Sequence, residues 1–270
     1  MGLMDDIKRD AIKTGAKIQT DEERELETKL NKLFYLPKDI DNETKFVKQV
    51  MTRGQETQER KGLHASAIIV PETKFCYRQQ VLSLFYKQLQ GEQTPIGLMR
   101  VFEEGNAIHE KWQRLFIRGE YAKPEDCDRT QFDKEHDLQY TPDIICDIDG
   151  VPYVVEVKSV NTYVFKKQKP HASGRKQLQL YMYLTGIHQG IVLQEDKNTQ
   201  EFRANIYKYN PEEIQPYITR LEDIQYHKGV LQTKHKLVKR HSNCTAYSCD
   251  MAKGCPMRDV CWKKSKEKLD

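Results

Sequence analysis

The 270-residue sequence contains no long apolar run. No stretch approaches the roughly 18 apolar residues that a helix needs to span a bilayer. The N-terminal segment MGLMDDIKRDAIKTGAK also lacks the apolar core of a secretory signal. We therefore expect a cytoplasmic protein that has no membrane partner.

The sequence also lacks a phosphate-binding loop of the form G-x-x-x-x-G-K-S/T, internal repeats and low-complexity tracts. Any DNA unwinding would therefore need a helicase or recombination partner. The charge is nearly balanced, with 44 Lys and Arg against 40 Asp and Glu, although bases gather between Lys228 and Lys268. This distribution permits a nucleic-acid partner without identifying one.

The apolar pattern predicts an α/β protein. Helical spacing is expected at residues 21–36, 76–85, 95–118, 173–187 and 211–228, and two strand hairpins at 143–160 and 190–209. Residues 119–140 are polar and show no periodicity, so we expect a loop there. Residues 1–60 are highly charged and predict a helical arm or subdomain.

The first hairpin, TPDIICDIDGVPYVVEVKS, carries three charged groups in an apolar setting. Asp149-Gly150 favours a tight turn, and pairing about that turn places Asp143 opposite Glu156. Strand alternation puts Glu156 and Lys158 on one face. Two neighbouring carboxylates repel each other unless a cation lies between them, which favours Mg²⁺ or Mn²⁺. Such a site suits phosphodiester hydrolysis, with Lys158 orienting the nucleophile or stabilising the transition state.

A simpler alternative stays open from the residues alone. An acid and a base two positions apart on a strand commonly form an exposed ion pair on the solvent face. The wider context favours a metal site. The arrangement "PD", twelve residues, then "EVK" resembles the signature of the PD-(D/E)xK nuclease superfamily. The resemblance implies that Asp143 and Glu156 bind the metal and that Val157 contributes to the same site. It also implies that Lys158 is the lysine of the PD-(D/E)xK signature.

Two helical motifs extend the resemblance. GNAIHEKWQ is similar to the G-x-x-x-H helix of the RecB-type branch, which implies a metal-site role for His109. A histidine on an amphipathic helix can equally be packed or solvated, although neutral imidazole does bind divalent ions.

KQLQLYMYL resembles the branch's Q-x-x-x-Y helix, with Gln177 and Tyr181 on one helical face. The resemblance implies that this pair helps to hold DNA and the surroundings of the catalytic lysine. Gln179 and Tyr183 repeat the spacing, and we prefer the first register because of the packing of Leu178, Leu180 and Met182. A core tyrosine with a solvated glutamine remains the simpler alternative.

Seven cysteines in a cytoplasmic chain are not expected to form disulfides. Four of them, Cys244, Cys249, Cys255 and Cys261, are clustered and could bind Zn²⁺. With Cys76 they resemble the iron–sulfur subgroup of RecB-type nucleases, in which one upstream and three downstream cysteines hold a 4Fe-4S cluster. Cys76, Cys255 and Cys261 match this pattern, and either Cys244 or Cys249 is the fourth ligand. The cluster would then fasten the C-terminal tail to the first helix of the core without a catalytic role.

A group of basic residues brackets the end of the hairpin and the start of the Gln177 helix. Phosphate contacts from such a group are independent of sequence and sensitive to salt. Neighbouring aromatic residues, Tyr163, Phe165 and Tyr181, are expected to stack on bases. This favours single-stranded or end-frayed DNA, and an exonuclease over a site-specific endonuclease. The basic residues are Lys166, Lys167, Lys169, Arg175 and Lys176.

The resemblance covers roughly residues 60–262 and implies a restriction-endonuclease-like core, a central mixed sheet flanked by helices, with a Cys-rich tail tied back to the N-terminal helical region. It divides the chain into residues 1–60, a nuclease core at 61–240 and an iron–sulfur segment at 241–270 that packs with Cys76. It implies a bacterial or phage-encoded, Mg²⁺- or Mn²⁺-dependent DNA exonuclease of recombination, repair, phage DNA metabolism or CRISPR adaptation. A structure-specific endonuclease on the same core and an inactive, zinc-stabilised DNA-binding protein are the alternatives.

Overall fold

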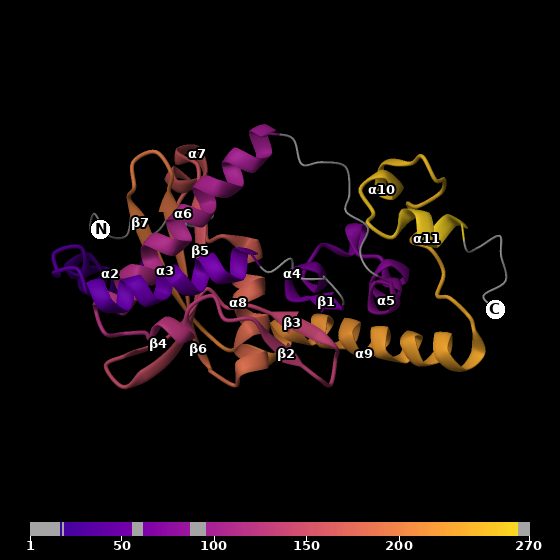
Figure 1. The fold of residues 1–270 in the computed structure, drawn as a ribbon, viewed down its shortest axis with the longest axis horizontal. Coiled ribbons are helices and arrows are strands. Elements are labelled where there is room, and N and C mark those ends of the chain that lie inside the picture. The colour runs from indigo at the N-terminus through magenta and orange to yellow at the C-terminus, as the bar shows by residue number, and fades with distance from the viewer. Residues whose placement is uncertain (1–16, 18, 56–61, 87–95, 264–270) are drawn as a thin grey trace, which may run out of the picture. The chain divides into compact units, whose positions relative to one another are not determined.

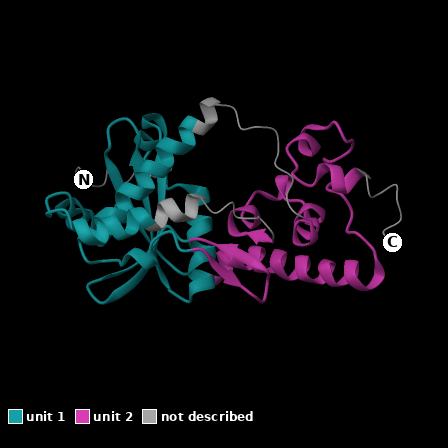
Figure 2. Ribbon diagram, in the orientation of Figure 1, with its two compact units in different colours: residues 1–55, 100–129, 142–210 teal, residues 56–99, 130–141, 211–270 magenta. Residues whose placement is uncertain are grey.

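The computed structural model describes residues 17, 19–55, 62–86 and 96–263 and confirms the predicted mixed α/β class (Figure 1). The chain forms two compact units (Figure 2). Unit 1 comprises residues 1–55, 100–129 and 142–210, and unit 2 comprises residues 56–99, 130–141 and 211–270. Both units are assembled from segments far apart in the sequence, so they run across the boundaries predicted at residues 60 and 240.

Unit 1 is built on a four-stranded mixed sheet in the order β4-β5-β6-β7. β5 pairs antiparallel with β4 and parallel with β6, and β6 pairs antiparallel with β7. The parallel pair is joined through α7 and α8, as a parallel connection requires. The strands are β4 (Ile144–Ile148), β5 (Val151–Val160), β6 (Gln189–Asp196) and β7 (Phe202–Lys208), and the two connecting helices are α7 (Thr162–Lys166) and α8 (Ala172–Thr185).

Helices cover both faces of this sheet. α2 (Asp21–Leu33), α3 (Ile40–Gln55) and α6 (Ile96–Arg118) contribute to one apolar core with strand residues such as Val155 and Val157. α8 packs against β5 and β6. Because strand side chains alternate, Glu156 and Lys158 lie on the face opposite Val155 and Val157, which is the face of α8.

The turn of the β4–β5 hairpin has the geometry that its sequence predicts. Asp149 and Gly150 both have positive φ angles, 56° and 80°, which suits the two-residue turn of a twisted hairpin. Ile144 pairs with Val155, so the predicted register is confirmed. Asp143 comes directly before β4 and therefore lies across from Glu156.

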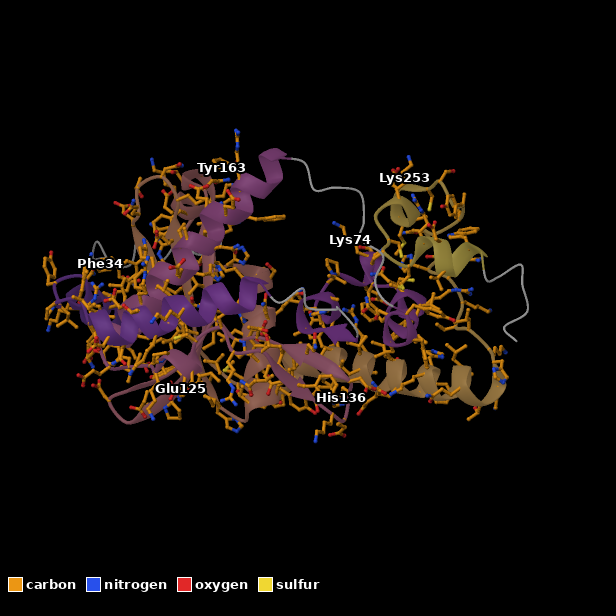
Figure 3. The ribbon with its side chains drawn as sticks, in the orientation of Figure 1. Phe34, Lys74, Glu125, His136, Tyr163 and Lys253 are labelled. Atoms are coloured by element: carbon orange, nitrogen blue, oxygen red, sulfur yellow. The ribbon has the colours of Figure 1, made fainter. Side chains whose placement is uncertain are left out.

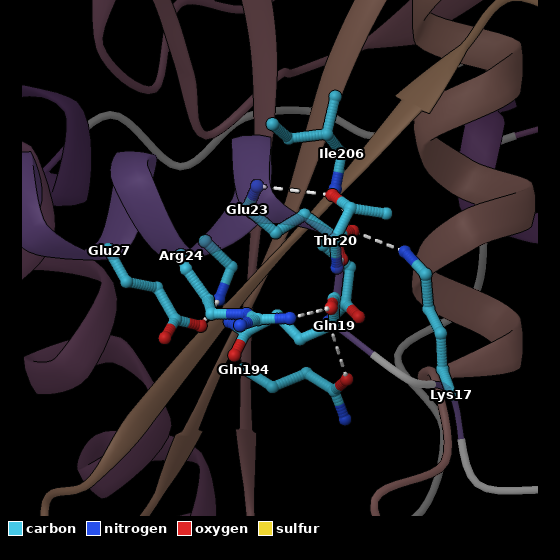
Figure 4. A network of polar contacts seen from close by, with 10 residues as sticks. Lys17, Gln19, Thr20, Glu23, Arg24, Glu27, Gln194 and Ile206 are labelled. Atoms are coloured by element: carbon cyan, nitrogen blue, oxygen red, sulfur yellow. Dashed lines mark hydrogen bonds and ion pairs between the residues drawn. The ribbon is translucent and has the colours of Figure 1, made fainter. Parts of the chain in front are cut away.

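The outer edge of β7 is covered by α2 (Figure 4). Thr20 and Glu23 form a capping box at the start of this helix. Oε1 of Glu23 accepts a hydrogen bond from the backbone N–H of Ile206 at 2.8 Å, and Oε1 of Glu27 accepts one from Ala204 at 2.7 Å. Two glutamates one turn apart thus satisfy edge N–H groups that would otherwise be open to another strand. Part of the predicted arm is therefore built into unit 1.

Unit 2 combines a small sheet in the order β1-β3-β2 with several helices. The loop predicted at residues 119–140 is wrong in part, because two strands form there, each too short for alternation to show in the sequence. The remaining elements are β1 (Leu63–His64), α4 (Ala65–Ile68), η1 (Glu72–Lys74), α5 (Tyr77–Phe85), β2 (Gln131–Asp133), β3 (Leu138–Tyr140), α9 (Pro211–Lys234), α10 (Asp250–Lys253) and α11 (Arg258–Lys263), with η2 (Pro124–Asp126) in unit 1. None of the helices in the described part of the chain combines the length and apolarity that crossing a membrane requires.

Candidate active site

The β4–β5 hairpin brings the two predicted acids together. The backbone N–H of Val157 donates a hydrogen bond of 2.7 Å to Oδ2 of Asp143, which fixes this carboxylate beside β5. Glu156 is buried, with only 1% of its surface exposed. Its carboxyl group is close enough to Asp143 for the charge of Asp143 to raise the pKa of Glu156.

Glu156 occupies an electrostatically costly position. Oε1 forms an ion pair with Nζ of Lys158. Oε2 is buried and has no hydrogen-bond partner within the described residues. Burial, and after it the charge of Asp143, raise the pKa of Glu156 to about 8 against the opposing effect of Lys158. An ionised Glu156 would therefore be stabilised by a cation near Oε2.

His109 reaches the same site from α6. Its Nδ1 lies 3.1 Å from Oδ1 of Asp143. Burial lowers the pKa of His109, but the charges of Asp143 and Glu156 outweigh burial, so the pKa is raised overall. The structure thus places the predicted histidine beside both acids.

Gln113 is a site residue that the sequence analysis missed. Its Nε2 donates a hydrogen bond of 3.0 Å to the backbone carbonyl of Asp143, and its side chain is buried. The available signal was its position four residues after His109, which places both side chains on one face of α6.

The side chain of Lys158 extends towards α8. Its Nζ donates to Oε1 of Gln177 at 3.3 Å, and Nε2 of Gln177 donates to the hydroxyl of Tyr181 at 2.8 Å. Burial lowers the pKa of Lys158, but the charges of Glu156 and Asp143 prevail and raise it. Lys158 is therefore held as an ammonium group between a carboxylate and an amide oxygen.

Of the two glutamines that fit the Q-x-x-x-Y spacing, the structure places Gln177 in contact with Lys158. Gln179 has a different role: its Nε2 donates to the carbonyl of Lys208, and its Oε1 accepts from the backbone N–H of Asn210, both at 2.9 Å. Gln179 therefore secures the end of β7.

His171 and Gly174, at the start of α8, also lie beside Lys158 and were missed. Nδ1 of His171 accepts a hydrogen bond of 3.0 Å from the N–H of Gly174 and so caps the helix. Histidine is not among the usual N-cap residues, so the local sequence gave no signal for this role.

The predicted basic residues remain largely available to a ligand. Lys166, Lys167, Lys169 and Lys176 are exposed, whereas Arg175 is half-buried with its guanidinium 5.1 Å from the ring centroid of Tyr207.

The three predicted stacking aromatics differ in exposure. Tyr163 projects from α7 with 70% of its surface exposed, and Nζ of Lys167 lies 3.9 Å from its ring centroid (Figure 3). Phe165 and Tyr181 are buried, so the prediction that they stack on bases is wrong. Phe165 packs under the guanidinium of Arg203 at 4.6 Å, and Tyr181 is turned towards Gln177.

Five cysteines gather in unit 2. Cys76 directly precedes α5, the thiol of Cys249 caps α10, and Cys261 lies in α11, which packs on α5. Burial raises the pKa of Cys255 to about 11, and the nearby thiols of Cys76, Cys261 and Cys244 add to the shift. In this unit, α11 of the C-terminal tail packs on α5, which follows Cys76.

The pKa of the Cys244 thiol is raised for the same reasons. Burial raises its pKa, and the thiols of Cys249, Cys261 and Cys76 contribute. Cys127 and Cys146 lie apart from this group in unit 1, where both are buried. Within the described residues, no three His, Cys, Asp or Glu side chains are arranged so that they could hold a metal ion as they stand.

Comparison of the fold with solved structures finds exonucleases. LHK-Exo, an alkaline exonuclease from Laribacter hongkongensis, matches at 15% identity over 66% of this chain and 94% of its own, with a TM-score of 0.48. Its complex with dAMP matches at 16% identity with the same coverage and TM-score. A phage-related exonuclease from Haemophilus somnus 129PT matches at 15% identity over 66% of this chain and 97% of its own, with a TM-score of 0.43. No protein-family model matches the sequence, and no curated protein does.

Proposed function

We propose that the protein is a metal-dependent DNA exonuclease that acts on single-stranded DNA or on DNA ends. The observation that carries the proposal is the buried Oε2 of Glu156, which has no hydrogen-bond partner within the described residues and lies beside the Asp143 carboxylate. Two acids in such a place favour a bound cation over two negative charges alone.

The oxygen donors of Asp143 and Glu156 have the chemistry that a hard divalent ion such as Mg²⁺ or Mn²⁺ prefers. Carboxylate and carbonyl oxygens are the ligands that such ions prefer. Asp143 and Glu156 would hold the ion, with the backbone of Val157 and the imidazole of His109 as further ligands. The chemistry that the ion supplies is neutralisation of charge on the phosphate and a lower pKa for its bound water.

The chain's own residues supply the rest of the proposed mechanism. The ammonium of Lys158 is positioned to stabilise negative charge that develops on the scissile phosphate. Gln177 holds this ammonium through its amide oxygen, and Tyr181 holds the amide. Asp143 is kept in place by the Val157 amide.

The surface beside this site supports a nucleic-acid substrate. Lys166, Lys169 and Lys176 offer charges to phosphates, and Tyr163 offers an exposed ring to a base. Exposed aromatic rings beside basic residues are typical of surfaces that bind single strands without sequence preference.

Digestion of end-labelled DNA tests the proposed activity. The wild-type protein is incubated with Mg²⁺ or Mn²⁺ and with 5′- or 3′-labelled linear single strands, linear duplexes and a closed single-stranded circle. An exonuclease degrades the linear strands and leaves the circle intact. Cleavage of the circle would instead indicate an endonuclease on the same core.

We also propose that the thiols of unit 2 hold a 4Fe-4S cluster, with zinc as the alternative. Cys76, Cys255 and Cys261 would be ligands, and Cys244 is favoured as the fourth because its thiol affects that of Cys255. Cys249 instead accepts a hydrogen bond from the N–H of Ala252 at 3.4 Å. Such a group would tie the C-terminal tail to α5 and so stabilise the fold.

A further inference from the structure

The start of α8 lies along the whole side chain of Lys158. Gly174, in the first turn of this helix, is buried. A Cβ atom on Gly174 would stand 3.1 Å from Cγ and 3.3 Å from Cε of Lys158. One turn later, Gln177 accepts the hydrogen bond from Nζ at 3.3 Å. α8 therefore contacts both the aliphatic stem and the charged end of the lysine.

The glycine at position 174 is explained by space and not by backbone conformation. The glycines with positive φ among the described residues are Gly62, Gly150 and Gly186, so Gly174 has an ordinary helical backbone. Alanine is normally preferred over glycine inside a helix because it loses less conformational entropy on folding. At this position, however, an alanine methyl would meet the Lys158 stem at less than the usual contact distance.

His171 completes the same arrangement. Its Nδ1 accepts the N–H of Gly174 and lies 3.2 Å from the point where a Cβ on Gly174 would stand. The imidazole and the Lys158 stem therefore meet at one place on α8. Because the cap fixes the first turn of the helix, it also fixes the surface on which the lysine rests.

We propose that Gly174 and His171 are positioning residues for Lys158: Gly174 leaves the channel in which the lysine stem lies, and His171 holds the helix turn that forms it. The importance of this position for catalysis rests on the proposed function, since that function gives Lys158 its role. The steric relationship itself does not depend on any activity.

Gly174→Ala tests the channel, and Gly229→Ala is the matched control. Gly229 also lies inside a helix, α9, but a Cβ there has no neighbour within 4 Å. We expect Gly174→Ala to lower kcat on single-stranded DNA by roughly tenfold to a hundredfold with KM unchanged, because small misplacements of a reacting group have effects of this size. Gly229→Ala should leave both constants unchanged, and neither variant should lower the melting temperature.

His171 is tested by a pair of substitutions. His171→Asn keeps an oxygen that can accept the Gly174 N–H, whereas His171→Ala removes the cap. We expect His171→Ala to lower kcat and His171→Asn to restore most of it. Equal kcat values for His171→Ala and the wild type would overturn the role of His171.

A measurement without substrate separates this inference from the proposed function. Lysines are reductively dimethylated with ¹³C-formaldehyde and a borane reductant, and the resonance missing from Lys158→Arg identifies Lys158. Gly174→Ala should move this resonance, and Gly229→Ala should leave it in place. An unmoved Lys158 resonance in Gly174→Ala would overturn the channel, whether or not the protein cleaves DNA. A wild-type protein without nuclease activity would overturn the proposed function alone.

Discussion

Gln113 donates a hydrogen bond from Nε2 to the backbone carbonyl of Asp143 at 3.0 Å. Four residues earlier on the same helix, His109 contacts the Asp143 carboxylate. α6 therefore fixes both the main chain and the side chain of Asp143, the residue that directly precedes β4.

Gln113→Ala should reduce both stability and activity. The substitution removes one of two hydrogen bonds to the Asp143 carbonyl, which also accepts from the backbone N–H of Asp128 at 3.0 Å. The loss of one such bond costs about 0.5–1.5 kcal/mol. Denaturant unfolding measures the stability and digestion of labelled single-stranded DNA measures the activity. Arg114→Ala is the control, because its ion pair with Glu110 is half-exposed at 3.7 Å and contributes at most about 1 kcal/mol. Equal losses of stability and activity in the two variants would contradict the role of Gln113 in holding Asp143.

The two glutamines of α8 should give opposite results. Gln177→Ala removes the acceptor of Lys158, so we expect a loss of activity with little change in the free energy of unfolding. Gln179→Ala removes the hydrogen bonds to the carbonyl of Lys208 and from the N–H of Asn210, so we expect destabilisation by about 0.5–1.5 kcal/mol per bond with activity retained in the folded protein. Activity assays below the melting temperatures of both variants check this. The reverse pattern would favour the other register of the motif.

The stability of the metal-free protein should fall as pH rises towards 8. The pKa of Glu156 is raised from an ordinary 4.5 to about 8 by burial, so the folded protein keeps a proton that the unfolded chain has released. Over this range the unfolded state binds fewer protons, and the free energy of unfolding therefore decreases with pH. Thermal unfolding in chelator from pH 5 to 9 measures the decrease.

Glu156→Gln should flatten this pH dependence, because a neutral amide does not titrate. His109, whose pKa is also raised, contributes in the same direction and accounts for the part that remains. Adding Mg²⁺ or Mn²⁺ at pH 8 should stabilise the wild type and not the variant. An identical response of both proteins to the metal would contradict Glu156 as a ligand.

Exposed lysines beside the site should set the salt dependence of DNA binding. Each phosphate contact to a single strand contributes about 0.7 to the slope of log K against log salt, so Lys169→Gln with Lys176→Gln should reduce the slope by up to roughly 1.4. Fluorescence anisotropy in chelator measures binding without digestion. Lys234→Gln with Lys236→Gln changes the net charge equally at exposed positions in unit 2 and is the control. An equal reduction in the control would mean that net charge alone determines binding.

A 4Fe-4S cluster bound by the cysteines of unit 2 should give the purified protein a visible absorption band. A 4Fe-4S cluster gives an anaerobic preparation that is brown, with iron and sulfide in stoichiometric amounts. Cys76→Ser should lose the colour and lower the melting temperature, because the tail is no longer tied to α5. A colourless anaerobic preparation with stoichiometric zinc would replace the iron–sulfur proposal with the zinc alternative.

The parts of the site that could be predicted from the sequence are those with local causes. Asp149-Gly150 sets its own turn, and strand alternation then places Glu156 and Lys158 on one face. The resemblance to the Q-x-x-x-Y helix pointed to Gln177 and Tyr181, which a spacing of four residues places on one helical face. These signals need only a few consecutive residues.

The parts that were missed depend on tertiary contacts. Which aromatic ring is buried is decided by residues from other strands and helices, such as Arg203 over Phe165. The need for glycine at position 174 arises only from a lysine on a different element. The short strands β2 and β3 are stabilised by pairing and not by their own pattern.

The central claim is that Asp143 belongs to a metal-dependent nuclease site, and Asp143→Asn tests it most directly. The amide oxygen can still accept the Val157 N–H, so the fold should be kept while one negative charge is lost. Wild type and variant are incubated with linear single-stranded DNA in Mg²⁺ or Mn²⁺ and in chelator, and unfolding is measured in parallel. We expect degradation only by the wild type with metal, and an unchanged melting temperature for the variant. Equal degradation by both proteins, or by the wild type in chelator, would contradict the account.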